Sequence, residues 1–407
     1  MTQYRCRVCA GPLEQFLDLG TQPLSDRFVE PGRIGGEFVY QLAVGACRDC
    51  TMVQLVQEVP REEMFGDEYP YVSSGSATMR AHFGRLAERF LRTELTGRDP
   101  FVVELGCNDG VFLRHIADAQ VRHLGVEPSA SVAREAAKLG VDVRVDFFDA
   151  DLAQEILATS GPADVVYAAN TLCHIPYVDS VLRGVRTLLS DTGVFVFEDP
   201  YFSEILDRAS YDQIYDEHFY LFTATSIRNL ARRSGLMLAD VEPIGVHGGE
   251  LRYTLVKEGA RTPAPAVAET VEREHRTGVT DPARLRDFAE VVGRNSHDLR
   301  RLLERLREDG SRVLGYGATA KSATVLNYCG IGPDLIEAIC DSTPAKQGRL
   351  TPGSHIPVWP SEEFRADYPD HAVLFAWNHA EEIMGKEAAF REAGGRWITY
   401  VPRVRVS

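Results

Sequence analysis

The sequence has no long hydrophobic run. No apolar stretch approaches the roughly 18 residues of a membrane-spanning helix. The first residues, MTQYRCRVCAGPLEQF, have neither the basic start nor the apolar core of a signal peptide. We therefore expect a cytosolic chain without a membrane partner. Thiols stay reduced in that compartment, so the eight cysteines should be metal ligands, core residues or reactive groups and not disulfides.

Lysine is also scarce, and positive charge is in deficit. Only five of the 44 basic residues are lysines, and the formal net charge is −15. A nucleic-acid groove needs a clustered basic surface, so this balance argues against a nucleic-acid partner. A small anionic ligand can still be held locally, which makes the positions of the few lysines informative.

At 407 residues the chain is too long for one ordinary core, and its patterns divide it into three predicted domains. Residues 1–72 are loop-rich, with only short strand-like pieces such as FVYQLAVGAC, so we expect little core there. Residues 73–260 begin with a helix that Gly97 should close, and then alternate between apolar strands and helices. This pattern predicts a parallel sheet covered on both faces. Residues 261–407 begin with a charged helical connector and then repeat the alternation in a smaller doubly wound domain.

Four cysteines in the N-terminal segment have the spacing of a metal site. Cys6 and Cys9 form one C-x2-C pair, and Cys47 and Cys50 form a second. Two such pairs give zinc four soft ligands in a closed tetrahedron, which is typical of a structural site. The alternative is two pairs of buried core cysteines, but a segment with so little apolar periodicity needs a metal to hold it.

The stretch FVVELGCNDGVFL predicts a strand, a glycine turn and the start of a helix. Its spacing is not G-x-G-x-x-G, which tells against a dinucleotide. Three features in this order look like a class I S-adenosylmethionine methyltransferase. They are an acidic loop, a carboxylate after the next strand that can take the ribose hydroxyls, and VDFFDAD after the third strand, which can frame an adenine. A Rossmann-like domain without cofactor is the alternative. The predicted donor-binding residues are Glu104, Gly106, Asn108, Gly110, Glu127, Pro128, Phe148 and Asn170.

The stretch YDQIYDEHFYLF follows the fifth predicted strand of that domain, where an acceptor is usually covered. Methyl transfer to carbon requires removal of a proton and stabilisation of the resulting charge. His218 can be the base, with Glu217 orienting it, and Tyr215 can donate to a developing enolate oxygen. His174, in NTLCHIPYV after the fourth strand, is expected at the same rim. A histidine with satisfied hydrogen bonds, on the surface or in the core, is the alternative for His218.

Taken together, these motifs resemble the bacterial nucleotide-sugar C-methyltransferases that methylate C3′ of a dTDP-4-keto-6-deoxy sugar in antibiotic biosynthesis. The resemblance covers the whole chain: CRVCAGPLEQFLDLGTQPLSDRF and CRDC resemble the zinc module, VVELGCNDGVFL the donor loop, NTLCHIPY and IYDEHFYLF the active-site segments, and GYGATAKSATVLNY the C-terminal domain. It implies a structural zinc ion and S-adenosylmethionine as cofactors.

The resemblance also implies roles for single residues. His218 would be the base at C3′ and Tyr215 would contact the C4′ oxygen, while Glu217, His174 and Tyr69 would complete the pocket. HGGELR, after the donor domain, is similar to the family's sugar-nucleotide contact. The implied substrate-binding residues are His247, Gly248, Gly249, Arg252, Tyr316, Ala318, Lys321 and Asn378.

A second glycine turn, VLGYGATAKSATVL, places Lys321 in the first turn of a helix. Helix N–H groups and an ammonium make an anion site, and a diphosphate is the anion expected here. The stretch lacks the Walker A pattern, and a merely structural turn with an exposed lysine is the alternative. Lys346, in CDSTPAKQG, could be part of a plain surface loop.

Two other functions compete with this interpretation: a non-catalytic protein that holds a nucleotide sugar for a partner enzyme, and a nucleic-acid methyltransferase guided by its zinc knuckle. The chain is expected to act as a monomer on a 2,6-dideoxy sugar. Whether C3′ carries a hydroxyl or an amino group, whether C2′ is deoxy, and how the chain assembles are left open.

Overall fold

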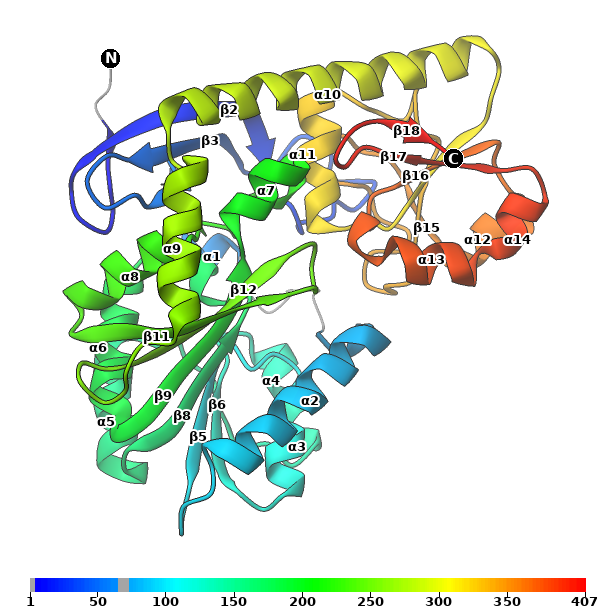
Figure 1. The fold of residues 1–407 in the computed structure, drawn as a ribbon. Helices are drawn as coiled ribbons and strands as arrows, with labels where there is room; N and C mark the ends of the chain where they lie inside the picture. The colour runs from blue at the N-terminus through cyan, green and yellow to red at the C-terminus, as the bar shows by residue number, and fades with distance from the viewer. Residues whose placement is uncertain (1–3, 65–72) are drawn as a thin grey trace.

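Three β-sheets organise the molecule (Figure 1). The computed structural model describes residues 4–64 and 73–407. Among these residues, no helix is both long and apolar enough to cross a membrane. The predicted α/β class, with a cysteine-rich N-terminal module and two doubly wound units, is confirmed.

The N-terminal sheet is antiparallel and better formed than the sequence predicts. Its second strand is 12 residues long and buries Leu13, Leu17 and Leu19. The expectation of short strand-like pieces with little core was therefore wrong, because two register shifts interrupt the period-two alternation in the sequence. The segment ends with helix α1 (Arg61–Met64). In spatial order the strands are β1 (Tyr4–Arg5), β2 (Pro12–Pro23), β3 (Val39–Cys47), β4 (Val53–Leu55) and β10 (Tyr220–Leu221).

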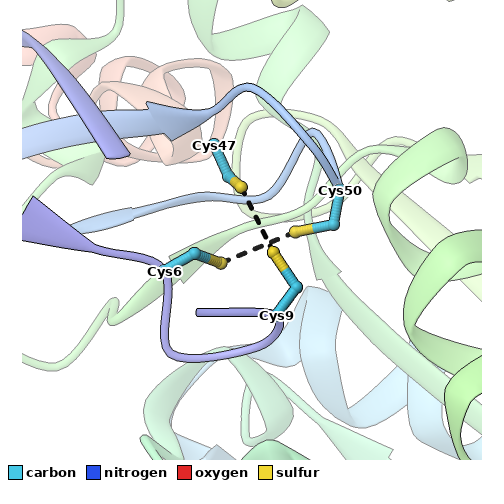
Figure 2. A group of neighbouring side chains, drawn as sticks. All are labelled: Cys6, Cys9, Cys47 and Cys50. Carbon is cyan, nitrogen blue, oxygen red and sulfur yellow. Dashed lines mark hydrogen bonds between the residues drawn. The ribbon is translucent and has the colours of Figure 1, made fainter. Parts of the chain in front are cut away.

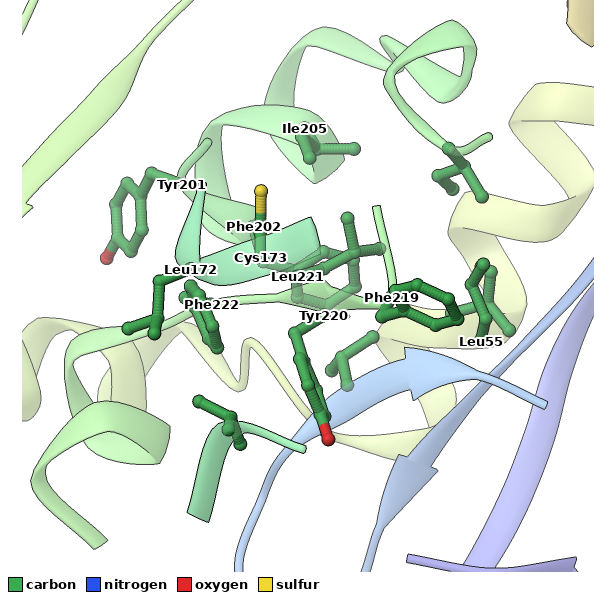
Figure 3. Close-up of a cluster of buried hydrophobic side chains, with 14 of the residues drawn as sticks. Leu55, Leu172, Cys173, Tyr201, Phe202, Ile205, Phe219, Tyr220, Leu221 and Phe222 are labelled. Atoms are coloured by element: carbon green, nitrogen blue, oxygen red, sulfur yellow. The ribbon is translucent and has the colours of Figure 1, made fainter. Parts of the chain in front are cut away.

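The last of these strands comes from the stretch that carries the predicted base. Tyr220 is the register partner of Gln54, and Leu221 that of Val53. Figure 3 shows the aromatic side chains around β10 packed in one buried cluster with Leu55. The N-terminal sheet therefore fixes the position of the stretch 211–222.

The central sheet has seven strands and holds the first glycine turn. Its strands from β7 to β9 run parallel, and β11 and β12 complete it in antiparallel fashion. The strand order reverses between β5 and β8, which is where such sheets bind ligands. In spatial order the strands are β11 (Leu236–Ile244), β12 (Glu250–Lys257), β9 (Leu189–Pro200), β8 (Ala163–Ala169), β5 (Phe101–Leu105), β6 (Arg122–Val126) and β7 (Val143–Arg144).

The helix predicted before this sheet is α2, capped by the Ser76 side chain. It ends at Thr93, not near Gly97 as expected, because the N–H groups of Glu94 and Leu95 both donate to the Phe90 carbonyl and turn the chain early. The helices of this part are η1 (Ser73–Gly75), α2 (Ala77–Thr93), α3 (Leu113–Asp118), α4 (Ala130–Lys138), α5 (Ala150–Ser160), η2 (Leu172–His174), α6 (Val178–Leu188), α7 (Phe202–Arg208), η3 (Tyr211–Gln213) and α8 (Ala224–Arg233).

The charged connector forms α9 (Pro265–Thr277) and the long α10 (Pro282–Glu308). α10 crosses from β2 to α11, so it packs between the N-terminal and C-terminal units as predicted (Figure 1). The C-terminal unit holds β15 (Val358–Pro360), β14 (Ile339–Asp341), β13 (Val313–Tyr316), β16 (His371–Leu374), β17 (Arg396–Thr399) and β18 (Arg405–Val406) in that spatial order, with helices α11 (Ala320–Cys329), α12 (Ser361–Ala366), η4 (Trp377–His379), α13 (Ala380–Lys386) and α14 (Ala388–Glu392).

Candidate functional site

The four N-terminal cysteines converge on one point, with their sulfur atoms turned toward one another (Figure 2). The Sγ atoms of Cys6 and Cys50 are 3.5 Å apart, and those of Cys9 and Cys47 are 3.4 Å apart. A zinc–sulfur bond of about 2.3 Å implies sulfur separations of about 3.8 Å in a tetrahedron. The Gln54 amide donates to the Cys6 sulfur at 3.0 Å. The cluster therefore fits a closed structural zinc site.

The first glycine turn follows β5, and its backbone explains the glycines. Gly106 has φ +67°, and an added Cβ would lie 2.5 Å from the Thr171 hydroxyl oxygen. Gly110 has φ +76°, and its added Cβ would crowd the Ala136 side chain at 3.0 Å. A side chain at either position would be strained and would fill the turn, so the loop lets a ligand approach its backbone.

Acidic side chains surround this turn and leave buried oxygens without hydrogen bonds. One oxygen of Glu104 and one of Asp109 are buried and accept no hydrogen bond from the described residues. Burial, followed by the charges of Asp109 and Glu127, raises the pKa of Glu104 well above its usual value. Unpaired acidic oxygens suit a ligand that carries positive charge, as the sulfonium and ammonium groups of S-adenosylmethionine do. The turn therefore fits the predicted methyl donor.

Glu127 follows β6 directly and touches the turn. Its two carboxylate oxygens accept the backbone N–H groups of Asn108 at 3.0 Å and Ser129 at 2.9 Å. Asn108 has φ +50°, and its side-chain oxygen accepts the Ser73 N–H at 2.9 Å. The carboxylate predicted to take ribose hydroxyls thus also holds the loop in shape.

The remaining predicted donor-binding residues lie around the same edge of the sheet. Pro128 follows Glu127, and Phe148 is buried between β7 and α5. Asn170 follows β8, has φ +47°, and donates its N–H to the Glu198 carbonyl at 2.7 Å. Strand order and turn geometry thus assemble this set at the carboxyl edge, and its contacts with a donor stay a prediction.

The predicted base His218 is buried and has both ring nitrogens engaged. Its Nδ1 lies 2.6 Å from the Gln213 carbonyl oxygen, so this nitrogen carries the proton. Its Nε2 lies 2.8 Å from the Tyr215 hydroxyl, which donates to it. Burial, followed by the nearby His174, lowers the pKa of His218 well below its usual value. The imidazole is therefore neutral, with Nε2 in the form that can accept a proton.

The sequence predicts that Glu217 orients His218, but the Gln213 carbonyl and the Tyr215 hydroxyl take the two ring nitrogens. Instead, Glu217 Oε2 lies 3.8 Å from Nδ1 of His174. The rings of His174 and His218 lie 5.1 Å apart between centroids, so the structure does bring these predicted residues together. Tyr69 lies outside the described residues.

The predicted sugar-nucleotide residues meet where the central and C-terminal units touch. Lys321 Nζ lies 3.4 Å from the His247 carbonyl oxygen and 5.4 Å from the centre of the Trp377 ring. An added Cβ on Gly248, where φ is +95°, would lie 2.6 Å from that ring, and Gly249 follows at φ +112°. Asn378 is the next residue of η4. Two segments distant in sequence, one at His247 and one at Trp377, thus lie beside the Lys321 ammonium.

Two other residues of this set have polar groups engaged elsewhere. The Tyr316 hydroxyl donates to Glu387 at 2.7 Å within the C-terminal core. Ala318 lies beyond it, where its N–H donates to Asp341 and its carbonyl accepts from Lys346. Lys346 is therefore largely buried and is not part of a plain surface loop.

Arg252 forms a buried ion pair: its guanidinium donates to Glu198 at 2.6 Å and to Glu242 at 2.9 Å. We expect Arg252→Met to lower the free energy of unfolding by about 3–5 kcal/mol, because it removes the guanidinium from the buried Glu198 carboxylate and leaves His82 as its remaining side-chain partner. Chemical denaturation would measure this. Arg89→Met is the matched control, since exposed Arg89 pairs with the same Glu242 and should cost only about 0–1 kcal/mol. Equal losses in both variants would contradict a structural role for Arg252.

Several residues that shape the site could not be predicted from the sequence. The Gln213 carbonyl sets the tautomer of His218, which no side-chain pattern indicates. Asp212 is buried and accepts from Trp377 and Tyr400, so the C-terminal unit holds this stretch directly. Asp199, at the end of β9, is fully buried beside Cys173. An acidic residue at the end of an apolar strand was the one available signal for it.

Comparison with known proteins adds independent findings. A putative zinc binding domain matches residues 6–65, a methyltransferase domain residues 78–241, and a C-methyltransferase C-terminal domain residues 245–402. The C-methyltransferase NovU of Streptomyces niveus is 35% identical, covering 98% of this chain and 96% of that protein.

Solved structures are far more distant. The magnesium protoporphyrin IX methyltransferase of Synechocystis PCC 6803 with bound SAM is 14% identical, covers 44% of this chain and 79% of its own, and has a TM-score of 0.33. A Haloferax volcanii complex of the Trm112 activator with a methyltransferase is 15% identical, covers 44% and 93%, and has a TM-score of 0.36.

Sequence similarity over nearly the full length and three consecutive family matches agree with the cysteine cluster and the acidic donor turn. The chain therefore belongs to the family of S-adenosylmethionine-dependent C-methyltransferases that carry an N-terminal zinc-binding domain.

Proposed function

We propose that the enzyme methylates C3′ of a dTDP-4-keto-6-deoxyhexose through an enolate. The main support is the arrangement around His218: a buried neutral imidazole, with its Nδ1 proton held by the Gln213 carbonyl and a phenol at Nε2. Transfer to oxygen or nitrogen can proceed by alignment alone, whereas transfer to carbon needs such a base.

The chain's own groups account for each step. The ketone at C4′ acidifies the neighbouring C–H bond, and His218 Nε2 takes the C3′ proton while the electron pair moves onto the C4′ oxygen. The Tyr215 hydroxyl, released from Nε2 when that atom takes the proton, can donate to this oxygen. The bound donor supplies an electrophilic methyl group on its sulfonium. C3′ attacks this methyl, the carbon–sulfur bond breaks, and the ketone re-forms.

Burial supports this division of roles. His174 and Tyr215 enclose His218 within a region that excludes water. Burial lowers the pKa of His174 to about 3, so this second imidazole is also neutral and does not repel the proton that His218 takes. Two neutral imidazoles next to a phenol can stabilise an enolate without adding a fixed charge to the empty site.

The acceptor's diphosphate would lie near Lys321. This ammonium is half-buried at the start of α11, beside the His247 carbonyl and over the Trp377 ring. Within the chain it has no ion pair shorter than 4 Å among the described residues, although Asp212 and Glu250 are close enough to influence its pKa. A cation whose charge is not matched by a direct carboxylate contact is suited to an anionic ligand.

The deciding experiment incubates the enzyme and donor with a small panel of dTDP-4-keto-6-deoxyhexoses and measures the product mass. A gain of one methylene supports the proposal, and its absence from the whole panel contradicts it. Both carbons beside a C4′ ketone are acidic, so the position needs its own measurement. Proton NMR in deuterium oxide should show exchange at C3′, and exchange confined to C5′ would refute the C3′ assignment.

We expect Lys321→Ala to raise KM for the sugar nucleotide more than it lowers kcat. A diphosphate contact contributes equally in the ground and transition states, so its loss weakens binding but leaves the chemical step nearly unchanged. Steady-state kinetics with varied acceptor would measure both constants. Lys386→Ala, at an exposed position of α13, is the matched control. Acceptor kinetics that are the same in both variants would remove Lys321 from the substrate site.

A further inference from the structure

A second group of metal-ligand side chains lies beside the proposed base. Cys173 and His174 come from η2, and His218 comes from the segment before β10. One ligand atom from each lies within 4.8 Å of those of the other two. The described residues hold this arrangement twice, here and in the N-terminal cysteine cluster. The sequence motifs predict a metal at the N-terminal cluster alone.

The surroundings of this group resemble those of a metal ligand set. A ligating histidine usually donates its other ring N–H to a carbonyl or carboxylate, and His218 Nδ1 does so to Gln213. The Asp199 carboxyl is fully buried, and it lies close enough to Cys173 for the thiol and the backbone of that residue to hydrogen-bond with it. Asp199 therefore places a carboxylate next to the Cys173 ligand atom.

The donor atoms indicate which cations fit. One thiolate and two imidazoles favour zinc and neighbouring transition metals, whereas magnesium and calcium prefer oxygen. Three protein ligands with one open position are typical of a zinc ion that also binds water or substrate. Tetrahedral bonds to sulfur and nitrogen require ligand atoms about 3.3–3.8 Å apart. Shifts of about 1 Å in the side-chain positions would bring the three ligand atoms to these separations.

We propose that Cys173, His174 and His218 bind Zn²⁺ or another borderline-soft divalent cation, and that this cation inhibits methyl transfer. On binding, the Cys173 S–H bond breaks, a sulfur–metal bond forms, and the proton leaves to solvent. His218 Nε2 exchanges the Tyr215 hydroxyl for the metal and can then no longer take a proton. The inhibition rests on the proposed function, whereas the binding does not.

Cobalt titration tests the binding. Full-length protein with its structural zinc in place should take up one Co²⁺, with a thiolate-to-cobalt absorption band in the near ultraviolet. Cys173→Ser should lose the band and bind Co²⁺ at least tenfold more weakly, while Cys340→Ser, which alters a buried cysteine of β14, should behave as wild type. The proposed site would be refuted if the wild type binds no Co²⁺ in addition to its structural zinc, or if Cys173→Ser binds Co²⁺ as tightly as the wild type.

X-ray absorption at the cobalt edge tests the site without a variant that could fail to fold. One sulfur and at least two nitrogen neighbours are expected, and four sulfur neighbours would place the cobalt in the N-terminal cluster and refute the proposal.

Activity measurements test the inhibition. Micromolar Zn²⁺ should lower turnover at least tenfold, reversibly with a chelator, and Mg²⁺ should not. Stoichiometric binding with full activity would overturn the inhibition. A protein inactive without added metal would count against the proposed function and leave the binding result intact.

Discussion

His218→Gln should lower turnover by roughly 10²–10⁴-fold, the usual contribution of a general base, while both ligands still bind. Glutamine fills a similar volume and can keep the hydrogen bond to the Gln213 carbonyl, but its amide cannot accept a proton at neutral pH. Turnover would be measured with saturating donor and acceptor, and calorimetry would measure the affinity for each. His371→Gln, in β16 of the C-terminal unit, is a control that should leave turnover unchanged.

Solvent exchange separates the base from a merely structural histidine. Wild-type enzyme should exchange the acceptor's C3′ hydrogen for deuterium without a reactive donor, and His218→Gln should not. Tyr215→Phe should show a smaller defect, because it weakens the stabilisation of the C4′ oxygen but leaves the base in place. Near-normal turnover and exchange in His218→Gln would make the stretch 211–222 a lid and would move the role of base to His174.

Cys47→Ser should unfold the N-terminal sheet and abolish methyl transfer, yet leave donor binding largely intact. Structural zinc in small cysteine domains contributes about 10–16 kcal/mol of apparent binding free energy, so losing one ligand removes much of the module's stability. The loss should reach the base, because β10 pairs with β4 and the Asp216 carboxylate accepts the Ser25 N–H at 3.0 Å. The donor turn belongs to the central sheet and should persist.

Metal analysis, amide exchange and donor calorimetry would test this outcome together. Fast exchange is expected across β2, β3 and β4, with donor affinity close to that of wild type. Cys329→Ser is a matched control, since Cys329 is a buried cysteine of α11 outside the cluster. If donor affinity falls as far as acceptor affinity in Cys47→Ser, the predicted boundary near residue 72 does not separate independent units.

The sequence alone determined the features that depend on local order along the chain. Two C-x2-C pairs indicate a zinc site, because four cysteine thiolates are a usual tetrahedral ligand set for structural zinc in a chain whose cysteines stay reduced. Apolar strands alternating with helices specify the central sheet and the smaller C-terminal sheet, because only parallel strands buried on both faces carry such runs. The glycine turn after β5 follows from the same logic, since its position after a buried strand places it at the ligand-binding edge.

The tertiary structure alone determined which groups form hydrogen bonds, ion pairs and strand pairs with one another. The tautomer of His218 depends on a backbone carbonyl at Gln213, Arg252 is engaged by Glu198 across neighbouring strands, and the stretch 211–222 gains its place by adding β10 to the N-terminal sheet. None of these partners is marked by residue type or spacing. Hydrogen-bond partners and strand pairing are chosen by the packing of distant segments, and the free energy of burying a polar group depends on which partner that packing supplies.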